Sequence, residues 1–390
     1  MKSDASNCVN LMDKHVLVVS QRFPPSQGGI QAAGAELAAM FATFGCRVSV
    51  ATSIAESVST SAWAVHVLAE QGFAAATGRL AQELRPDLVL VNGLGRGQLF
   101  PFALNCAPGV PVIYRAHGFN TAFQFHWSHP PFFGLPSFCR SFRDAFRNDR
   151  RIRNLAQCVF LDDASGIFKN FDIALASRRH CLNVSFIPNA VPSIVCNKSN
   201  SFRLKYGLSQ TKTMFLCVAN YCDRKGQVDA AKAIIHHPEL DAQFVFIGSE
   251  RNKTASVVER LAKGDGRIIP LHGVPRSDVV NAINCCDAAF LFARQEQQPL
   301  FLIEAMSCGK PWFCTDVGSV SKMRGGIVLR RRNESCFMDA VKDLLNQALR
   351  ISLGAECQDF WKSNYLPSVV HARWKRLLYD VFAGDVKCGY

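Results

Sequence analysis

Short, continuous runs of apolar residues recur along the chain, and they constrain its fold more than any other feature. Each run has the length of a strand, and several are followed by a segment with apolar residues at helical spacing. Strands that are apolar throughout are buried on both faces, as in a parallel sheet covered by helices. The expected strands are His15–Ser20, Arg47–Ala51, Asp87–Val91, Val110–Tyr114, Cys158–Leu161, Val184–Ile187, Met214–Ala219, Gln243–Ile247, Arg267–Leu271, Ala288–Ala293 and Trp312–Thr315. The pattern predicts an α/β fold.

Helices are expected between and after these runs. The predicted helices are Ala32–Phe44, Phe73–Leu84, one starting at Gln227, Ser277–Cys285, Leu300–Cys308, Val341–Leu349 and Pro367–Phe382. A chain of 390 residues is too long for one ordinary core, so two domains are expected. The pattern breaks at Pro188–Val191, and the following segment to Ser201 has the composition of a linker. We therefore place the domain boundary at residue 190.

The composition is that of a globular protein, with 48% hydrophobic and 19% charged residues. The sixteen cysteines are scattered, without a CxxC pair or zinc-type spacing, and many fall inside apolar runs. They are expected to be buried, reduced thiols of a cytoplasmic protein. The N-terminus lacks the apolar segment of a signal peptide, and no apolar run is long enough to span a membrane. The net charge of +13 allows several anionic partners and does not choose among them.

The stretch from Ala288 to Gly318 carries the most chemistry. It reads as strand, loop, helix and strand, with Glu296 in the loop and Glu304 in the helix eight positions later. The helix N-terminus offers unpaired backbone N–H groups and a positive dipole end, which suit a phosphate. Two carboxylates that accept hydrogen bonds from hydroxyls, beside an anion site, would fit a nucleotide sugar. The alternative is that both glutamates simply face solvent.

Three further positions are candidates for ligand contacts. The adjacent glycines Gly28 and Gly29, after the first strand, let a backbone approach a ligand closely, or form an ordinary tight turn. His117 follows a strand at the end where open α/β sheets bind ligands, and it is either a hydroxyl partner or structural. Arg224 and Lys225 open a helix and could neutralise a diphosphate, or be solvated basic residues of a turn.

The segment 123–154 differs from the rest because it is aromatic, interrupted by prolines and then rich in arginine. Taken as a helix, it has an apolar stripe and an opposite basic face. The stripe consists of Phe138, Phe142 and Phe146, and the basic face includes Arg143, Arg147 and Arg150. Such a helix could lie in an anionic membrane interface, or pack its Phe stripe onto its own domain. Because the arginines gather on one helix without a recognisable reading motif, nucleic-acid binding is not expected.

These residues together resemble the retaining GT-B glycosyltransferases of the large family that includes sucrose synthases, bacterial mannosyltransferases and lipopolysaccharide core transferases. The resemblance runs from about His15 to Phe382. Its most specific part is Glu296, seven residues, then Glu304-Ala-Met-Ser-Cys-Gly-Lys-Pro, which looks like the paired-glutamate motif of that family. The supporting parts, in the expected order, are the PP…GG loop at Pro24–Gly29, the His-Gly pair at His117, PNAV at Pro188–Val191 and the Lys225-Gly226 turn.

The resemblance implies a GT-B fold: two facing Rossmann-like domains with a cleft between them. Residues 1–190 would bind the acceptor, residues 191–365 the donor, and the helix in 366–390 would cross back to the first domain. Glu304 would bind the ribose hydroxyls, Glu296 the transferred sugar and Lys225 the diphosphate. The implied catalytic residues are His117, Glu296 and Lys225, and the implied donor-binding residues are Gly28, Gly29, Asn220, Arg224, Lys225, Val274, Gln298, Pro299, Leu300 and Glu304.

Some positions depart from the family pattern. Relatives commonly have Gly-Arg where this chain has Ala219-Asn220, so one expected phosphate cation is missing, and Arg224 is a candidate replacement. Gln297-Gln298-Pro299 replaces the frequent Gly-Phe-Gly in the loop that lines the sugar subsite. Ser319 stands for a usual glycine and Lys322 for a usual glutamate.

The resemblance implies a retaining hexosyltransferase that uses a nucleotide-diphosphate sugar and a glycan or glycolipid acceptor. No cofactor is expected, and no metal is required because the chain has no DxD pair. The expected location is cytoplasmic, or peripheral on the inner face of the cytoplasmic membrane. The alternatives are a nucleotide-sugar epimerase or phosphorylase of the same architecture and a non-catalytic nucleotide-binding relative.

Overall fold

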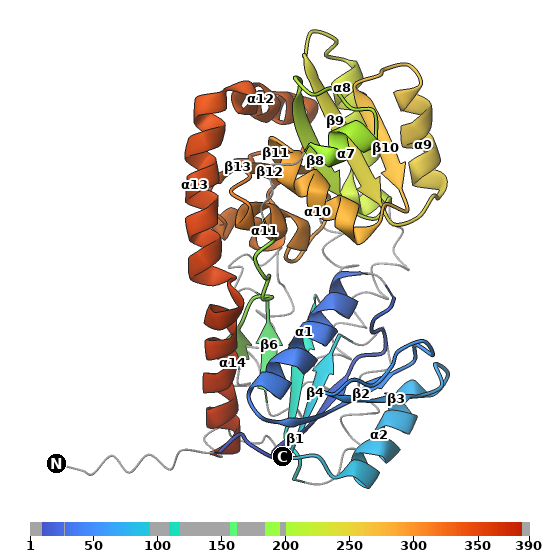
Figure 1. Cartoon of the computed structure of the whole chain (residues 1–390), viewed down its shortest axis with the longest axis vertical. Coiled ribbons are helices and arrows are strands. Elements are labelled where there is room, and N and C mark those ends of the chain that lie inside the picture. Colours follow the sequence, from blue (N-terminus) through green and yellow to red (C-terminus); the bar gives the residue numbers. More distant parts are fainter. Residues whose placement is uncertain are drawn as a thin grey trace, which may run out of the picture. The chain divides into compact units, whose positions relative to one another are not determined.

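The computed structural model describes residues 10–26, 28–93, 109–117, 157–161, 184–195 and 200–383. Within these residues the chain divides into two compact units, each built on its own sheet (Figure 1). The described residues up to Ala190 and those from Val370 onward form unit 1. Val191–Val369 form unit 2.

Unit 1 contains a seven-stranded sheet in the order β3-β2-β1-β4-β5-β6-β7. Every neighbouring pair is parallel, as the continuous apolar runs predicted. The elements are β1 (His15–Val19), α1 (Gly29–Thr43), β2 (Arg47–Thr52), β3 (Ala64–Val67), α2 (Phe73–Leu84), β4 (Leu88–Asn92), β5 (Val112–Ala116), β6 (Gln157–Phe160), β7 (Val184–Phe186) and α14 (Pro367–Phe382).

Both faces of this sheet are covered, and successive residues of one strand pack against different helices. In β1, Val16 and Val18 pack with α1 and α14, whereas Leu17 and Val19 pack with α2. Side chains alternate between the faces of a strand, so a strand buried on both faces is apolar at every position. This is why β1 reads as an uninterrupted apolar run.

The helix predicted at Pro367–Phe382 is confirmed as α14, and it belongs to the core of unit 1. Trp374 is fully buried, and its ring centroid lies 6.4 Å from that of Phe41 in α1. His371, one turn earlier, places Nε2 2.6 Å from Oε1 of Glu36. Residues near the two ends of the described chain therefore pack in the same hydrophobic core.

Unit 2 contains a six-stranded parallel sheet in the order β10-β9-β8-β11-β12-β13. One continuous apolar core joins its helices to the sheet. The elements are α7 (Ser201–Lys205), β8 (Thr213–Val218), the 3-10 turn Asp223–Lys225, α8 (Gln227–Ile235), β9 (Ala242–Gly248), α9 (Lys253–Ala262), β10 (Ile268–His272), α10 (Arg276–Cys285), β11 (Ala288–Leu291), α11 (Leu300–Ser307), β12 (Trp312–Thr315), the 3-10 turn Gly318–Lys322, β13 (Gly326–Leu329), α12 (Glu334–Leu345) and α13 (Gln347–Asn364).

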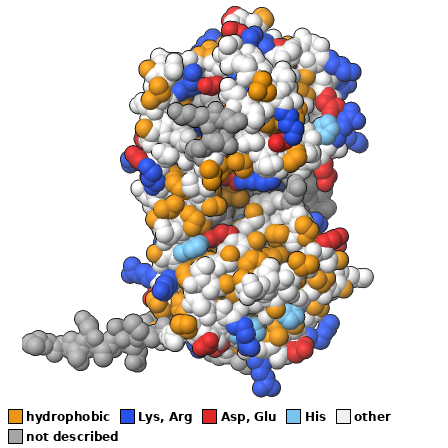
Figure 2. Space-filling model, in the orientation of Figure 1, with side chains coloured by type: hydrophobic (Ala, Val, Ile, Leu, Met, Phe, Trp, Pro, Cys, Tyr) orange, Lys and Arg blue, Asp and Glu red, His pale blue; other side chains and the backbone are white. Residues whose placement is uncertain are grey.

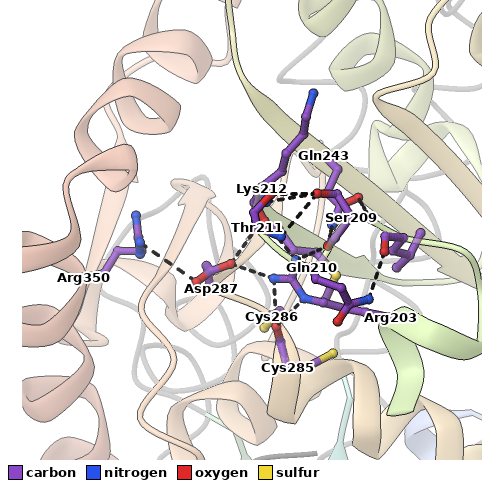
Figure 3. Close-up of polar contacts among 12 residues, drawn as sticks. Arg203, Ser209, Gln210, Thr211, Lys212, Gln243, Cys285, Cys286, Asp287 and Arg350 are labelled. Atoms are coloured by element: carbon purple, nitrogen blue, oxygen red, sulfur yellow. Dashed lines mark hydrogen bonds and ion pairs between the residues drawn. The ribbon is translucent and has the colours of Figure 1, made fainter. Parts of the chain in front are cut away.

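A buried arginine in α7 fastens the start of this unit (Figure 3). The Arg203 side chain donates hydrogen bonds to the backbone carbonyls of Ser209, Lys212 and Cys285. It also donates to Oδ2 of Asp287 at 2.9 Å, and the same oxygen accepts from the backbone N–H of Met214. One side chain therefore joins α7, the entry to β8 and the end of α10.

Some elements differ from the sequence prediction. The helical character predicted for Val341–Leu349 is confirmed except at Asn346, where α12 has ended at Leu345 and the Asn346 side chain caps the start of α13. The predicted linker is wrong in part, since Ile194 is buried in the core and Ser201 begins α7. The sequence reading did not include β3, β13, α7 or α9.

The cysteines singled out from the sequence are free thiols, and most are fully buried. Cys46, Cys158, Cys217, Cys286 and Cys314 are buried, whereas Cys285 is only partly buried. Burial raises the pKa of Cys217 to about 12 and that of Cys46 to about 11. Such thiols behave as small apolar groups at neutral pH.

Candidate functional site

Several of the residues predicted to hold a donor lie in unit 2, in the connections that follow two central strands of its sheet. β8 and β11 are neighbours, and the order of the strands reverses between them. Ligands of open α/β sheets bind at such a reversal, outside the carboxyl ends of the strands. The connection after β8 carries Asn220, Arg224 and Lys225, and the connection after β11 carries Glu296 and Gln298.

The two connections are joined through their backbones. The Arg294 N–H donates to the Arg224 carbonyl at 2.7 Å. Gly226 has φ +70°, and a Cβ at this position would lie 2.0 Å from the Phe292 carbonyl oxygen. The positive φ and the close contact with the Phe292 carbonyl both require glycine at position 226.

Lys225 and Glu296 form an ion pair between these connections. Nζ of Lys225 donates to Oε1 of Glu296, and each side chain is 20% exposed. The pair places one cation and one carboxylate side by side at the carboxyl ends of β8 and β11. Sequence reasoning predicted both residues for the site but not their direct contact.

Asp229 in α8 fixes the geometry around this pair, and the sequence did not point to it. Its Oδ2 accepts from Arg294 at 2.9 Å and from Arg332, while Arg332 Nε donates to the Phe292 carbonyl at 3.1 Å. Although burial opposes it, hydrogen bonds from Arg332 and Arg294 hold the pKa of Asp229 below its ordinary value. The carboxylate therefore stays ionised and keeps the β11 connection in place.

The N-cap residue of α11, Pro299, lies three residues beyond Glu296 in the sequence. The N–H of Leu302 donates to the Pro299 carbonyl at 3.0 Å. The amides of Leu300 and Phe301 precede this bond, so they have no acceptor within the helix. With the dipole of the helix, they form a local site for an anion.

Glu304 projects from the second turn of α11, and its carboxylate is held by Arg276. The two guanidinium nitrogens Nη1 and Nη2 donate to Oε2 at 3.1 Å and to Oε1 at 2.5 Å. The Glu304 side chain is 18% exposed and that of Arg276 is 60% exposed. Arg276 begins α10, two residues after the half-buried Val274, and the sequence did not single it out.

The remaining predicted donor residues are placed as follows. Asn220 is exposed and its Oδ1 accepts from Ser249 Oγ at 2.8 Å, while its carbonyl accepts from Gln227. The Arg224 side chain is exposed and forms no ion pair with a described residue. Gln298 is buried, and Pro299 caps α11.

Unit 1 has its own strand-order reversal, between β1 and β4. Ser20, Asn92 and His117 lie at the carboxyl ends of β1, β4 and β5, and they are connected. Asn92 Nδ2 contacts Ser20 Oγ at 3.1 Å, and Asn92 Oδ1 lies 2.6 Å from His117 Nε2. The position predicted for His117, just beyond a strand, is confirmed. Ser20 and Asn92 were not predicted, although each is a polar residue at the end of an apolar strand.

Gly28 and Gly29 lie at the start of α1 in unit 1. Gly28 has φ +148°, and a Cβ there would lie 2.5 Å from Oε1 of Gln31, so its conformation favours glycine. Gly29 is the first residue of the helix. The six residues of the predicted membrane helix, from Phe138 to Arg150, lie outside the described residues.

Among the described residues, no His, Cys, Asp and Glu side chains form a group of three or more that could hold a metal ion. None of the helices in this part of the chain combines the length and hydropathy of a membrane span. On the face shown in Figure 2, Lys and Arg side chains lie at several separate places with Asp and Glu among them, so this face does not single out one anionic partner.

Residues 212–347 match the family described as Glycosyl transferases group 1. A curated relative is N-acetyl-alpha-D-glucosaminyl L-malate synthase of Bacillus anthracis, which is 22% identical over 213 residues. The match covers 52% of this chain and 55% of that protein, so the chain spans about half the length of the curated relative. Unit 2 therefore contains a glycosyl transferases group 1 domain.

Solved structures extend the likeness to the whole fold. Sucrose-phosphate synthase from Thermosynechococcus elongatus matches with a TM-score of 0.78 and 14% identity, covering 95% of this chain and 100% of that one. WaaG, a glycosyltransferase involved in lipopolysaccharide biosynthesis, matches with a TM-score of 0.71 and 18% identity, and the match covers 95% of this chain and 100% of WaaG. Anabaena HepE in complex with UDP-glucose matches with a TM-score of 0.71 and 15% identity, and the match covers 93% of this chain and 99% of HepE. The predicted GT-B fold is confirmed.

Proposed function

We propose that this protein is a retaining glycosyltransferase that moves a hexose-type sugar from a nucleotide-diphosphate sugar to a lipid-linked or envelope-glycan acceptor. The glycosyl transferases group 1 domain supports the general activity. The observation that carries the proposal is the Lys225–Glu296 ion pair, formed where β8 and β11 end, with Glu296 four residues before the first residue of α11. A cation, a carboxylate and a helix N-terminus then meet at the position where α/β sheets bind nucleotides.

The leaving group of this reaction is a nucleoside diphosphate, so the enzyme must stabilise developing negative charge. We assign this to Lys225 and to the amides of Leu300 and Phe301, with Arg224 as a further cation and Asn220 close to the same turn. Fixed donors are effective because they need no reorganisation during the reaction. These groups supply the positive charge without requiring a metal.

Glu304 is assigned to the ribose, and the segment Gln298–Pro299 and Glu296 to the transferred sugar. Arg276 uses both oxygens of Glu304, so it sets the plane of that carboxylate. Val274, close in sequence to Arg276, is assigned to the nucleoside side of the pocket. These assignments follow the resemblance of the paired glutamates, and the local contacts within unit 2 agree with them.

We assign the reaction to a front-face path with retention, in which the leaving phosphate accepts the proton of the acceptor hydroxyl. His117 would contact the reacting sugar, and Gly28 and Gly29 would contribute backbone N–H groups. Burial, with a smaller effect of Arg115, lowers the pKa of His117 to about 3. A histidine that is neutral at pH 7 is suited to hydrogen bonding rather than to donating a proton as imidazolium.

The acceptor class rests on WaaG and on the basic aromatic segment 123–154, which would place the enzyme at the inner face of the cytoplasmic membrane. The name of the Bacillus anthracis relative favours a second candidate acceptor, a small hydroxy acid. Incubation of the protein and a labelled donor with lipid extract or with malate distinguishes the two classes by the product that becomes labelled.

A thermal-shift panel tests the donor site directly. We expect one of UDP, GDP and ADP, with its sugar conjugates, to raise the unfolding midpoint, since a ligand at a hundred times its dissociation constant stabilises by ~2.7 kcal/mol. Glu304→Gln should abolish most of this shift because a neutral amide is a weaker acceptor for the ribose hydroxyls.

Glu334→Gln is the matched control, because Glu334 pairs with His236 at the far end of α8. It should keep the full shift. If none of the nucleotides or sugar conjugates raised the unfolding midpoint of the folded protein, the donor site would be contradicted and a non-catalytic protein favoured.

A further inference from the structure

Asn92 is a buried polar side chain of unit 1 with several hydrogen-bond partners. It is the last residue of β4 and is completely buried. Its amide contacts three groups from three elements: Ser20 Oγ at 3.1 Å, the Ile30 carbonyl at 3.0 Å and His117 Nε2 at 2.6 Å. A buried amide with this many partners has a single favourable orientation.

The partners identify which end of the amide faces which group. The Ile30 carbonyl can only accept, so the Asn92 atom that contacts it is the NH₂ group. Ser20 agrees, because its hydroxyl donates to the Arg22 carbonyl at 2.8 Å and therefore accepts from Asn92. The oxygen Oδ1 is consequently the atom that faces His117.

An acceptor at this position determines the state of the imidazole. Nε2 must carry the hydrogen that Oδ1 accepts, so in the neutral ring Nδ1 carries a lone pair. Among the described residues none forms a hydrogen bond with Nδ1 of His117. Nδ1 is therefore an acceptor that no described residue uses.

Surrounding residues leave room for this arrangement. A Cβ at Gly34 in α1 would lie 2.9 Å from Asn92 Nδ2 and 2.8 Å from Ser20 Oγ. A Cβ at Gly93, where φ is +51°, would lie 2.9 Å from Cδ2 of His117. Glycine at both positions lets α1 and the β4 end approach the two side chains closely.

We propose that Asn92 is a positioning residue that holds His117 as the Nε2–H tautomer, so that Nδ1 accepts a hydrogen bond from a substrate hydroxyl. The identity of that hydroxyl, one on the transferred sugar, rests on the proposed function. The orientation of Asn92 and the tautomer of His117 do not.

The charges near His117 favour the same state. Arg115 on β5 is fully buried and donates to the Ile187 carbonyl and to Asn189 Oδ1, without a carboxylate in that contact. Burial lowers the pKa of Arg115 to about 10, so it is charged at neutral pH and opposes protonation of His117. The described groups in contact with the ring, Asn92 and Gly93, are uncharged, and so are the partners of Asn92, Ser20 and the backbone of Ile30.

The first test is a nitrogen NMR spectrum of the full chain labelled at histidine, with the His117 signals identified by their loss in His117→Gln. We expect the Nε2–H tautomer and no titration between pH 5 and 8. An Nδ1–H tautomer, or a titration in this range, would overturn the proposal. Because no substrate is present, this result is independent of whether the protein is a glycosyltransferase.

The second test is Asn92→Asp, which replaces the NH₂ group of the amide by oxygen and so turns the group that contacts Nε2 into a carboxylate. A carboxylate in contact with Nε2 favours imidazolium and should raise the pKa of His117 toward neutrality. Protonation removes the Nδ1 acceptor, so kcat/KM of the variant should be about tenfold lower at pH 6 than at pH 8. The wild type should show no such step attributable to His117.

Gln157→Glu is the control, since Gln157 is a buried amide of the same sheet that donates to Ser185. It should leave the His117 spectrum and the pH profile unchanged. If Asn92→Asp behaves like this control in both measurements, Asn92 is merely structural. If the spectra respond as expected but no donor is turned over, the positioning role stands and the proposed function fails.

Discussion

Glu296→Gln is expected to lower sugar transfer at least about a hundredfold while nucleotide-diphosphate binding stays as tight as in the wild type or becomes tighter. The first effect follows because a preorganised charged group is lost where the sugar becomes cationic, a loss that typically costs 10²–10³ in turnover. The second follows from the ion pair, because Glu296 neutralises Lys225 in the unliganded protein. Without that carboxylate, the full charge of Lys225 is available to the diphosphate.

Single-turnover transfer and nucleotide binding by calorimetry, measured on the same preparation, check both effects. Glu334→Gln makes the same chemical change at an exposed position of unit 2 and should alter neither. Weaker nucleotide binding in Glu296→Gln would mean that the carboxylate orients Lys225 more than it neutralises it. Unchanged transfer would remove Glu296 from the proposed mechanism.

Arg203→Met is expected to remove about 3–5 kcal/mol of the stability of unit 2, the usual cost of breaking a buried ionic network on one side. The change removes the Arg203 donor from Asp287 and from the carbonyls of Lys212 and Cys285 (Figure 3). Asp287 keeps the Met214 N–H, and the Ser209 carbonyl, which also loses Arg203, keeps the Gln243 amide. Methionine is similar in length, so the loss comes mainly from the unpaired polar groups.

Amide hydrogen exchange at β8 and α10 measures this loss locally. Lys212→Met is the control, because Lys212 pairs with the largely exposed Asp241 and its change should stay within about 0.5 kcal/mol. Equal protection in the two variants would show that the network does not anchor these elements.

The sequence predicted the strands best where they are buried on both faces. Trp312–Thr315 was predicted with its exact bounds, and the runs that became β8, β9 and β11 were shifted by no more than two residues. β3 was missed because it lies at the sheet edge with its side chains partly exposed, and so has no apolar run. The break at Asn346 within the predicted helical segment was missed because a side-chain cap interrupts a periodic pattern without changing it.

The candidate site shows the same limit. Lys225, Glu296 and Glu304 could be predicted because their local spacing resembles a motif. Asn92 and Arg276 could not, since each acts through a partner that is distant in sequence: 25 positions for Asn92 and His117, and 28 for Arg276 and Glu304. Such pairs arise only when parallel strands and helices bring remote segments to one edge.

The position of α14 has a consequence for the order in which the protein folds during synthesis. Unit 2 is one continuous segment, whereas unit 1 includes residues from Val370 onward, which follow unit 2 in the sequence. Until Trp374 emerges from the ribosome, the apolar face around Phe41 lacks its cover. Domains fold as their sequence becomes available. The core of unit 1 therefore cannot be completed until α14 has been synthesised, after the whole of unit 2.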